Sequence, residues 1–171
     1  MLYIAHSLKE LNFRSLMEVY IEGNMEKAEA SKIGPNQGLL EAEQDFYQYL
    51  RECFFTVHGA CYAIWVDAGK YVSAVRFEPY RDGVLLQALE TAPEHRCKGY
   101  ACKLTQQALE QLKFPKVYSH VSKKNAASMT VHKRCGFEKI LDHAAYIDGS
   151  VNHSAVTLLW QPKESVVERT L

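Results

Sequence analysis

Residues 95–101, which read HRCKGYA, constrain the fold more than any other segment of this 171-residue chain. The segment before them, residues 84–91, has the apolar and β-branched character of a strand. After them, apolar side chains recur on one face of a helix, at Ala101, Leu104, Ala108 and Leu112. Because Gly99 lets the backbone turn sharply between the two, the segment predicts a strand joined to a helix that begins near residue 99.

The same turn has the chemistry of an anion-binding site. The first turn of a helix leaves backbone N–H groups without partners, and the helix dipole adds partial positive charge there. Arg96 and Lys98 add fixed positive charge, and Gly99 leaves room for a phosphate to approach the backbone. A short pattern of this kind also occurs in ordinary turns between a strand and a helix, so further motifs have to decide between the two interpretations.

Periodicity and turn residues predict the remaining elements. They are a strand at residues 3–5, a helix that opens at the capping box of residues 7–10 and carries a buried stripe to Tyr20, a helix over 39–54 after a loop at 34–38, a hairpin of 61–66 and 71–77, a strand at 117–121, a helix over 126–135, and a final pair, 137–147 and 151–160, across Asp148 and Gly149. This order indicates an α/β or α+β sandwich. With 47% hydrophobic residues, the chain is long enough for one core. We therefore expect a single domain over residues 1–171, with a polar tail after about residue 162.

Composition excludes several classes of function. A formal net charge of zero argues against a general nucleic-acid binder. No segment approaches the roughly 20 apolar residues of a membrane span, and the amino terminus does not resemble a signal peptide. The five cysteines show neither CxxC nor zinc-ligand spacing, so we expect reduced thiols in the cytoplasm and no metal site.

Charge is distributed unevenly along the chain. Between residues 18 and 52 there are eight acidic residues against three basic ones, and between 95 and 139 ten basic residues against two acidic ones. The two runs are either solvated faces or a functional division, with an anionic cofactor on the basic half and a cationic substrate near the acidic half.

A second motif lies downstream of the glycine turn, with Asn125, Ser128 and His132 followed by Gly136 and Phe137. Together with LETAP at residues 89–93 and the turn at 96–101, it resembles the GNAT superfamily of acyl-CoA-dependent N-acetyltransferases. The family pattern has a strand ending Leu-x-Val-x-Pro, then Arg/Gln-x-x-Gly-x-Gly/Ala, a helix, a strand and Asn-x-x-Ala-x-x-Leu-Tyr-x-x-x-Gly-Phe. The resemblance is strong over about residues 84–140. It implies a single-domain GNAT fold, with a mixed, mostly antiparallel central sheet flanked by about four helices.

The resemblance also implies where acetyl-CoA binds. Its pyrophosphate would lie on the backbone N–H groups of the turn, and its pantetheine arm would pair with the backbone of residues 86–91. The implied cofactor-binding residues are Leu89, Glu90, Thr91, Arg96, Cys97, Lys98, Gly99, Tyr100, Ala101, Asn125 and Ser128. Asn125 would help to hold the cofactor arm, or it would serve as the N-cap of the helix that follows, or both.

An acceptor ammonium has to lose a proton before it can attack a thioester. Glu90 is the first candidate for the base, because several family members place a carboxylate that acts through water at this end of the central strand. The alternative is an exposed glutamate at a strand edge. His120 is the second candidate, since histidine titrates near neutral pH, and Glu78 is the third.

Many family members place a tyrosine seven residues after the asparagine, where it protonates the leaving thiolate. This chain has His132 there. His132 would donate the proton, with Ser128 or Tyr146 as substitutes, or the step would need no acid from a side chain. A covalent route through Cys97 is disfavoured, because the family transfers the acetyl group directly.

These residues predict an N-acetyltransferase that transfers an acetyl group from acetyl-CoA to a primary amine by direct attack. The excess of acidic residues between 18 and 52 hints at a cationic small molecule or a basic peptide terminus as the acceptor. A protein N-terminal acetyltransferase and a catalytically quiet acyl-CoA-binding or sensing module are the alternatives. A homodimer would be unsurprising.

Overall fold

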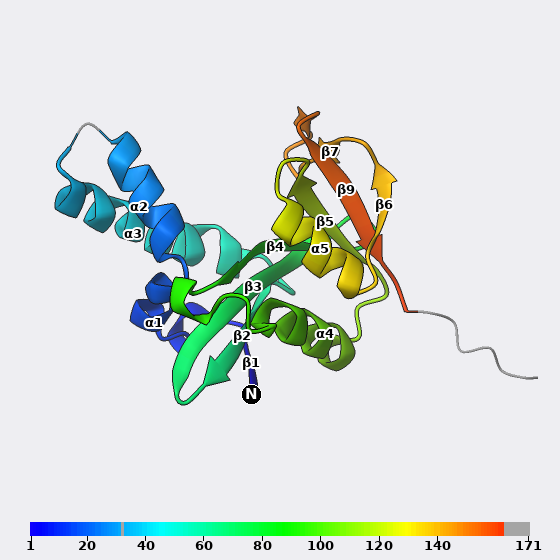
Figure 1. Ribbon diagram of the computed structural model, residues 1–171, viewed down its shortest axis with the longest axis horizontal. Helices are drawn as coiled ribbons and strands as arrows, with labels where there is room; N and C mark the ends of the chain where they lie inside the picture. The colour runs from blue at the N-terminus through cyan, green and yellow to red at the C-terminus, as the bar shows by residue number, and fades with distance from the viewer. Residues whose placement is uncertain (32, 163–171) are drawn as a thin grey trace, which may run out of the picture.

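Seven strands form one sheet in the order β1-β2-β3-β4-β5-β9-β6 in the computed structural model, which describes residues 1–31 and 33–162 (Figure 1). The strands are β1 (Leu2–Ala5), β2 (Cys61–Asp67), β3 (Lys70–Tyr80), β4 (Gly83–Thr91), β5 (Val117–Ser122), β6 (Glu138–Leu141) and β9 (Ala155–Trp160). Only β4 and β5 pair in parallel, and every other neighbouring pair is antiparallel. A separate two-stranded ribbon joins β7 (Ala144–Ala145) to β8 (Val151–Asn152).

Helices cover both faces of the sheet. Within the described residues there are five α-helices, α1 (Phe13–Val19), α2 (Ile21–Ala30), α3 (Pro35–Glu52), α4 (Tyr100–Leu112) and α5 (Ala126–Arg134), with short 3-10 turns η1 (Leu8–Glu10), η2 (Phe54–Thr56) and η3 (Pro93–His95). One buried cluster joins α1, α3 and η2 to β2 and β3. A second cluster packs α4 against β3, β4, β5 and β9 on the opposite face. The predicted mixed, mostly antiparallel sandwich is confirmed, with five helices where about four were expected.

The centre of the sheet opens between β4 and β5. The two strands pair only from Val84 with Val117 to Leu86 with Ser119. Directly beyond this point β4 contains a bulge at Ala88, whose φ of 50° is left-handed, and its register with β3 shifts. The carboxyl-terminal part of β4 therefore has one edge that no strand covers within the described chain.

The glycine turn and the β-α-β unit around it are confirmed. The helix after the turn begins at Tyr100, and the next strand and helix lie within one residue of their predicted bounds. Gly136, with a φ of 88°, follows α5 in the left-handed conformation that commonly ends helices. The hairpin of β2 and β3 is also confirmed, although β3 continues to Tyr80.

The predictions for the first two helices were partly wrong. Ser7 makes no cap hydrogen bond, and residues 8–10 form only a 3-10 turn. Helix α1 begins instead after Asn12, whose Oδ1 accepts a hydrogen bond of 3.1 Å from the backbone N–H of Ser15. The predicted loop at 34–38 is the first turn of α3, because proline is well suited to the first helical position.

Helix α2 was not predicted as a separate element, and it packs closely on α3 at Gly38. A Cβ on Gly38 would lie 3.0 Å from the carbonyl oxygen of Ala28 and 2.5 Å from Oγ of Ser31. Any side chain there would push the two helices apart. The glycine that interrupts the apolar pattern in the sequence is therefore what lets the helices touch.

The final strand pair is divided in two. β6 pairs with β9, while the turn at Asp148 and Gly149 belongs to the small ribbon of β7 and β8. The predicted polar tail after about residue 162 lies outside the described residues. Among the described helices, none combines the length and the apolar character that crossing a bilayer requires.

Candidate active site

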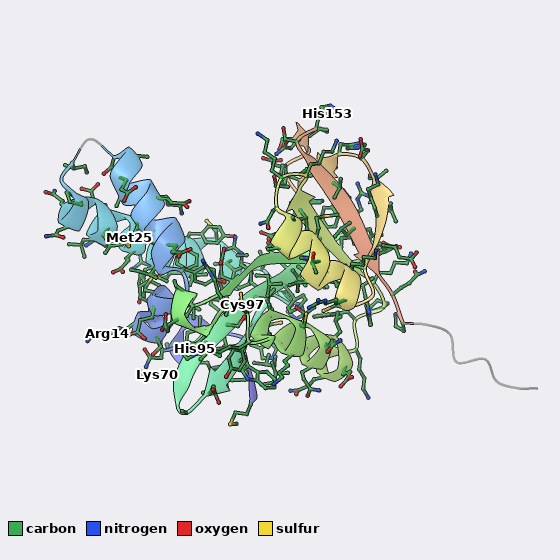
Figure 2. All side chains as sticks on the ribbon, viewed as in Figure 1. Arg14, Met25, Lys70, His95, Cys97 and His153 are labelled. Carbon is green, nitrogen blue, oxygen red and sulfur yellow. The ribbon has the colours of Figure 1, made fainter. Side chains whose placement is uncertain are left out.

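The turn between η3 and α4 presents main-chain N–H groups beside the carboxyl end of β4. Gly99 is the N-cap of α4 with a φ of 80°, and Cys97 has a φ of 60°. A Cβ placed on Gly99 would have no heavy atom within 4 Å, so the space next to the first turn of α4 is open. The free N–H groups of this turn and the open space fit a pyrophosphate. Figure 2 shows Cys97 and His95 in this region, at the amino end of α4.

The two cations of the turn have defined contacts. Arg96 forms ion pairs with Glu22 of α2, at 2.6 Å, and with Glu90 of β4, at 3.7 Å. Its Nε also donates a hydrogen bond of 3.2 Å to the carbonyl oxygen of Thr91. Lys98 donates to the carbonyl oxygen of Glu94 at 2.9 Å. Arg96 therefore connects the glycine turn to the opposite, acidic part of the molecule.

Other predicted cofactor-binding residues frame the open edge of β4. The side chain of Leu89 packs toward α4, and Oγ1 of Thr91 lies 2.9 Å from Oγ of Ser73. The phenol of Tyr100 donates to Asp67 at 2.6 Å, which ties the start of α4 to the end of β2. Ala101 lies in the first turn of α4. A chain that paired with the edge of β4 would thus run toward the N–H groups of the glycine turn.

Glu90 lies on the sheet face that carries α1 and α3. Partial burial raises the pKa of its carboxyl group, Arg96 lowers it, and the nearby Glu22 and Glu26 raise it again. Its side chain is still 46% exposed, so water can reach the carboxylate. A carboxylate with a raised pKa is a stronger base than an ordinary one, which is consistent with the predicted role.

His120 faces the same side of the sheet from β5. Its ring lies between the rings of Tyr80 and Tyr146, with centroids 5.6 and 5.1 Å away. Nε2 is buried and has no hydrogen-bond partner in the described part of the chain. Burial, followed by the charge of Arg81, lowers the pKa of His120, so the imidazole is neutral near pH 7 and able to accept a proton.

His132 is only 2% exposed and lies on the opposite face of the sheet. Its Nδ1 donates to the carbonyl oxygen of Ser128 at 2.8 Å, so Nε2 accepts the hydrogen bond from Oγ of Ser119, also 2.8 Å long. Burial lowers its pKa. These contacts make His132 a neutral bridge between α5 and β5, and the ring proton that a leaving thiolate would need is already engaged.

Asn125 serves as the N-cap of α5. Its Oδ1 accepts a hydrogen bond of 2.9 Å from the backbone N–H of Ser128. The cap uses only the carboxamide oxygen, so both interpretations of Asn125 given above are compatible with the structure. The third candidate base, Glu78, accepts a hydrogen bond from Nε2 of Gln87 and lies farther along the same face as Glu90.

A family model described as the acetyltransferase (GNAT) family matches residues 25–137, which is more than half of the chain. The chain belongs to the GNAT acetyltransferase family. It is therefore an acyltransferase, and the donor that this family uses is acetyl-CoA. A search among curated proteins finds no match.

Solved structures share the GNAT fold over nearly the whole chain. The ribosomal-protein-S18-alanine N-acetyltransferase from Escherichia coli is 15% identical with a TM-score of 0.58, and 100% of each chain is covered. The PaiA N-acetyltransferase from Thermoplasma acidophilum, in complex with coenzyme A, is 12% identical with a TM-score of 0.61, covering 95% of this chain and 99% of that one. A mutant of spermidine N-acetyltransferase from Vibrio cholerae is 19% identical with a TM-score of 0.58, covering 94% of each.

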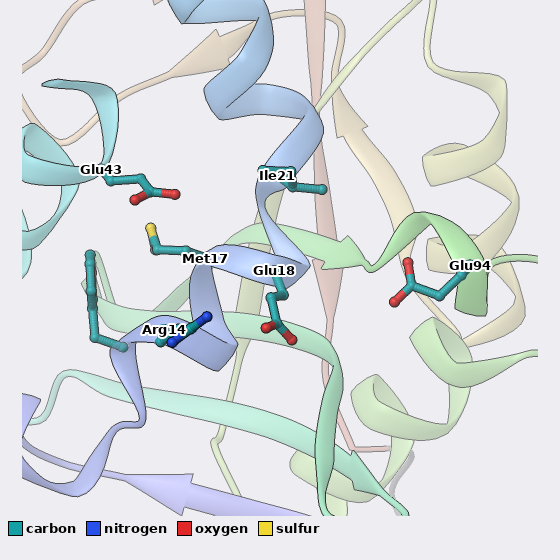
Figure 3. Close-up of a pocket in the computed structure, with 7 residues that line it drawn as sticks. Arg14, Met17, Glu18, Ile21, Glu43 and Glu94 are labelled. Carbon is teal, nitrogen blue, oxygen red and sulfur yellow. The ribbon is translucent and has the colours of Figure 1, made fainter. Parts of the chain in front are cut away.

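A pocket of about 600 Å³ lies in this GNAT domain, between residues of α1, α2 and α3 on one side and η3 on the other. Its lining residues are Phe13, Arg14, Met17, Glu18, Ile21, Glu43 and Glu94. Figure 3 shows Glu18 and Glu94 on opposite sides of this space, from α1 and η3. Three glutamates against one arginine make the lining acidic, as the charge distribution along the sequence suggested.

The structure adds three residues that the sequence analysis did not single out for the site. The hydroxyl of Tyr20 donates a hydrogen bond of 2.7 Å to the carbonyl oxygen of Ala88, at the bulge of β4. Arg76 of β3 and Gln87 of β4 pair across the two strands next to this bulge. A signal was present for Arg76, because it interrupts a strand in which Val75 and Phe77 are buried. None was present for Tyr20, which had been assigned to a buried helical stripe.

Proposed function

We propose that this acyltransferase moves an acetyl group from acetyl-CoA to the primary amine of an acceptor, by direct attack of the amine. The observation that supports the proposal is the open edge of β4, which leads from the bulge at Ala88 and the carboxylate of Glu90 to the glycine turn. The proposal thus assigns cofactor binding and proton removal to residues of one strand.

The residues of the turn would hold the cofactor through main-chain groups. The N–H groups between Cys97 and Ala101 would bind the pyrophosphate, with Lys98 and Arg96 as the nearest cations. The edge of β4 from Leu89 to Thr91 would pair with the pantetheine arm, and Asn125 and Ser128 would lie along it. Bound acetyl-CoA supplies an activated thioester.

Glu90 would accept the proton of the acceptor ammonium through a water molecule. Its raised pKa and its exposure support this role. His120 is the second candidate, because its ring is neutral and its Nε2, on the same face, has no hydrogen-bond partner among the residues that the structure describes. His132 would contribute by holding β5 in place through Ser119, unless its hydrogen bonds rearrange to free a proton for the thiolate.

The acidic pocket favours an acceptor whose amine is cationic when it binds. Glu18, Glu43 and Glu94 would attract an ammonium group or a basic peptide terminus. Peptides are included because one GNAT neighbour acts on a ribosomal protein, and polyamines because another acts on spermidine. We also propose that the enzyme works in the cytoplasm, since all five cysteines are free thiols. A homodimer stays an open alternative for its assembly.

The test has two steps, binding and then turnover. Calorimetric titration of acetyl-CoA should show binding at micromolar concentration or better. Release of free thiol should then be followed with a panel of diamines, polyamines, amino acids and short peptides with a free amino terminus. Turnover of one class supports the enzyme and identifies the acceptor. Binding without any turnover would favour the quiet acyl-CoA-binding module, an alternative supported by the fully engaged His132.

A further inference from the structure

Arg76 places a guanidinium on the sheet face that carries α1 and α3, here called the acceptor face, and among the described residues no carboxylate forms an ion pair with it. It lies on β3, and the side chain stays partly accessible while its Nε is fully buried. Among residues 1–31 and 33–162, Nε has no hydrogen-bond partner, and the guanidinium forms no ion pair. Its hydrogen bond to Gln87 is long, 3.4 Å from Nη2 to Oε1, and the guanidinium also interacts with the hydroxyl of Tyr62, whose pKa it lowers.

Aromatic rings hold this guanidinium in place. Its Cζ lies 4.9 Å from the ring centroid of Tyr49 and 5.7 Å from that of Phe54. Stacking on ring faces attracts the cation but leaves the N–H groups in the plane of the guanidinium without acceptors. The nearest carboxylate along the strand, Glu78, is bonded by the amide of Gln87 instead. The charge of Glu78 acts on Arg76 and raises its pKa, but among the described residues no carboxylate forms an ion pair with this fixed positive charge.

The position of Arg76 relates it to the candidate catalytic centre. Arg76 and Gln87 form the register pair on one side of the β4 bulge, and Ala74 and Glu90 form the pair on the other side. The phenol of Tyr20 contacts the bulge itself. Burial raises the pKa of Tyr20, while the charge of Arg76 lowers it and that of Glu90 raises it, so both charges lie near this hydroxyl.

We infer that Arg76 binds a carboxylate of the acceptor, so that the acceptor is an amine that also carries an acid group, such as an amino acid. The inference rests on the proposed function, because it places the amine near Glu90 and the acid group near Arg76, on opposite sides of the bulge. One guanidinium balances one negative charge, and its planar N–H groups match the two oxygens of a carboxylate. A phosphate dianion would need more cations than this face provides in contact with Arg76.

Binding of product-like ligands tests this inference without any need for turnover. The probes are N-acetylglycine, N-acetyl-β-alanine and N-acetyl-4-aminobutyrate, each paired with its primary amide, together with N-acetylaminomethylphosphonate. Each is titrated calorimetrically into the full chain, with and without coenzyme A. The measured quantity is the ratio of Kd values within a matched pair, which partial misfolding of a sample does not change.

The wild type should bind at least one acid about tenfold or more tightly than its amide, the ratio that 1.4 kcal/mol of charge-assisted hydrogen bonding represents. Arg76→Gln should bring that ratio to about one, and Arg76→Lys, which keeps the charge but loses the fork, should give an intermediate ratio. Arg51→Gln, which removes a largely exposed arginine of α3, is the matched control and should keep the wild-type ratio.

Three results would overturn the assignment. They are equal binding of acids and amides by the wild type, a preference for acids that survives in Arg76→Gln, and tighter binding of the phosphonate than of every carboxylate. Failure of the proposed function looks different, because it would appear as absence of acetyl-CoA binding or of turnover whatever the ratio. Circular dichroism of Arg76→Gln and Arg76→Lys checks that the fold is kept.

Discussion

The two faces of the sheet build their parts of the site in different ways. On the face of α4 and α5, the part of the candidate cofactor site that would bind the pyrophosphate consists of main-chain groups in a single short segment, the turn at Gly99. On the face of α1 and α3, the candidate acceptor site consists of side chains from segments that are far apart in the sequence, among them Tyr20, Arg76 and Glu90. The first kind of site depends on local backbone conformation and the second on long-range packing.

This difference explains what could be read from the sequence. The turn, the caps at Asn125 and Gly136 and the central β-α-β unit are local, so spacing and residue type predicted them correctly. Helix α2 was not predicted because its sequence, IEGNMEKAEA, is mostly polar and buries only Asn24 and Ala28, so it has no apolar stripe to recognise. The pairing of Tyr20 with the bulge joins residues 68 positions apart, and no local pattern encodes it.

The same difference appears for the histidines and carboxylates. Glu90, His120 and His132 were chosen by residue type and position, and the structure places the first two on the acceptor face and the third in the core. Strand alternation places His120 and Ser119 on opposite faces. It could not show that Ser119 and a backbone carbonyl would engage both nitrogens of His132.

The largest effect is expected for a variant that disrupts only the main-chain site at the glycine turn. In Gly99→Asp a carboxylate replaces open space beside the free N–H groups. Two like charges about 4 Å apart repel by about 4 kcal/mol near a protein surface, so the Kd for acetyl-CoA should rise about 1000-fold. Calorimetric titration measures it.

Gly99→Asn is the matched control, since asparagine has the same shape as aspartate and also tolerates a positive φ. It should bind acetyl-CoA at least about tenfold more tightly than Gly99→Asp does, because it carries no charge. Equal losses in the two variants would show that backbone conformation, and not an anion, explains the glycine.

A substitution on the acceptor face should leave the affinity for acetyl-CoA nearly unchanged. Glu90→Gln should lower kcat about 100-fold for an accepted amine, the lower end of what a general base contributes, and leave the Kd for acetyl-CoA within about threefold, since cofactor contacts there are main-chain. Because the pKa of Glu90 is raised, the acid limb of the wild-type pH profile should have its midpoint above 4.5, and the variant should lose that limb. An unchanged kcat would show that Glu90 is not the general base and would favour His120 in that role.

A variant of His132 tests whether this buried residue, on the face of α4 and α5, acts in the chemistry or in the structure. His132→Ala should lower the free energy of unfolding by about 2 kcal/mol or more, because it creates a cavity and leaves Ser119 without its partner. Denaturant titration followed by circular dichroism measures this. The kcat of the folded variant should stay within about threefold of the wild type. A 100-fold loss of kcat with unchanged stability would make His132 the acid for the thiolate.

The smallest expected effect is a dependence of stability on pH. The pKa values of His120 and His132 are both lowered from 6.5 by burial, so the unfolded chain binds protons that the folded protein does not. These two groups stabilise the fold above pH 6.5, and the contribution falls as the pH drops toward their folded pKa values. Each adds at most about 1.4 kcal/mol per pH unit. Denaturant titrations at pH 7.5 and 5.5 should give a lower free energy of unfolding at pH 5.5 for the wild type, and a smaller difference between the two pH values for His132→Phe.

The contacts of Arg96 would couple the protonation of Glu90 to the binding of an anion at the glycine turn. One guanidinium cannot bind Glu22, Glu90 and a pyrophosphate with full strength at the same time. Because Arg96 lowers the pKa of Glu90, any anion that draws the guanidinium toward the glycine turn leaves Glu90 a stronger base. By linkage, protonation of Glu90 must in turn favour binding of that anion. Binding of the acetyl donor would thus raise the pKa of the carboxylate that is proposed to remove the proton.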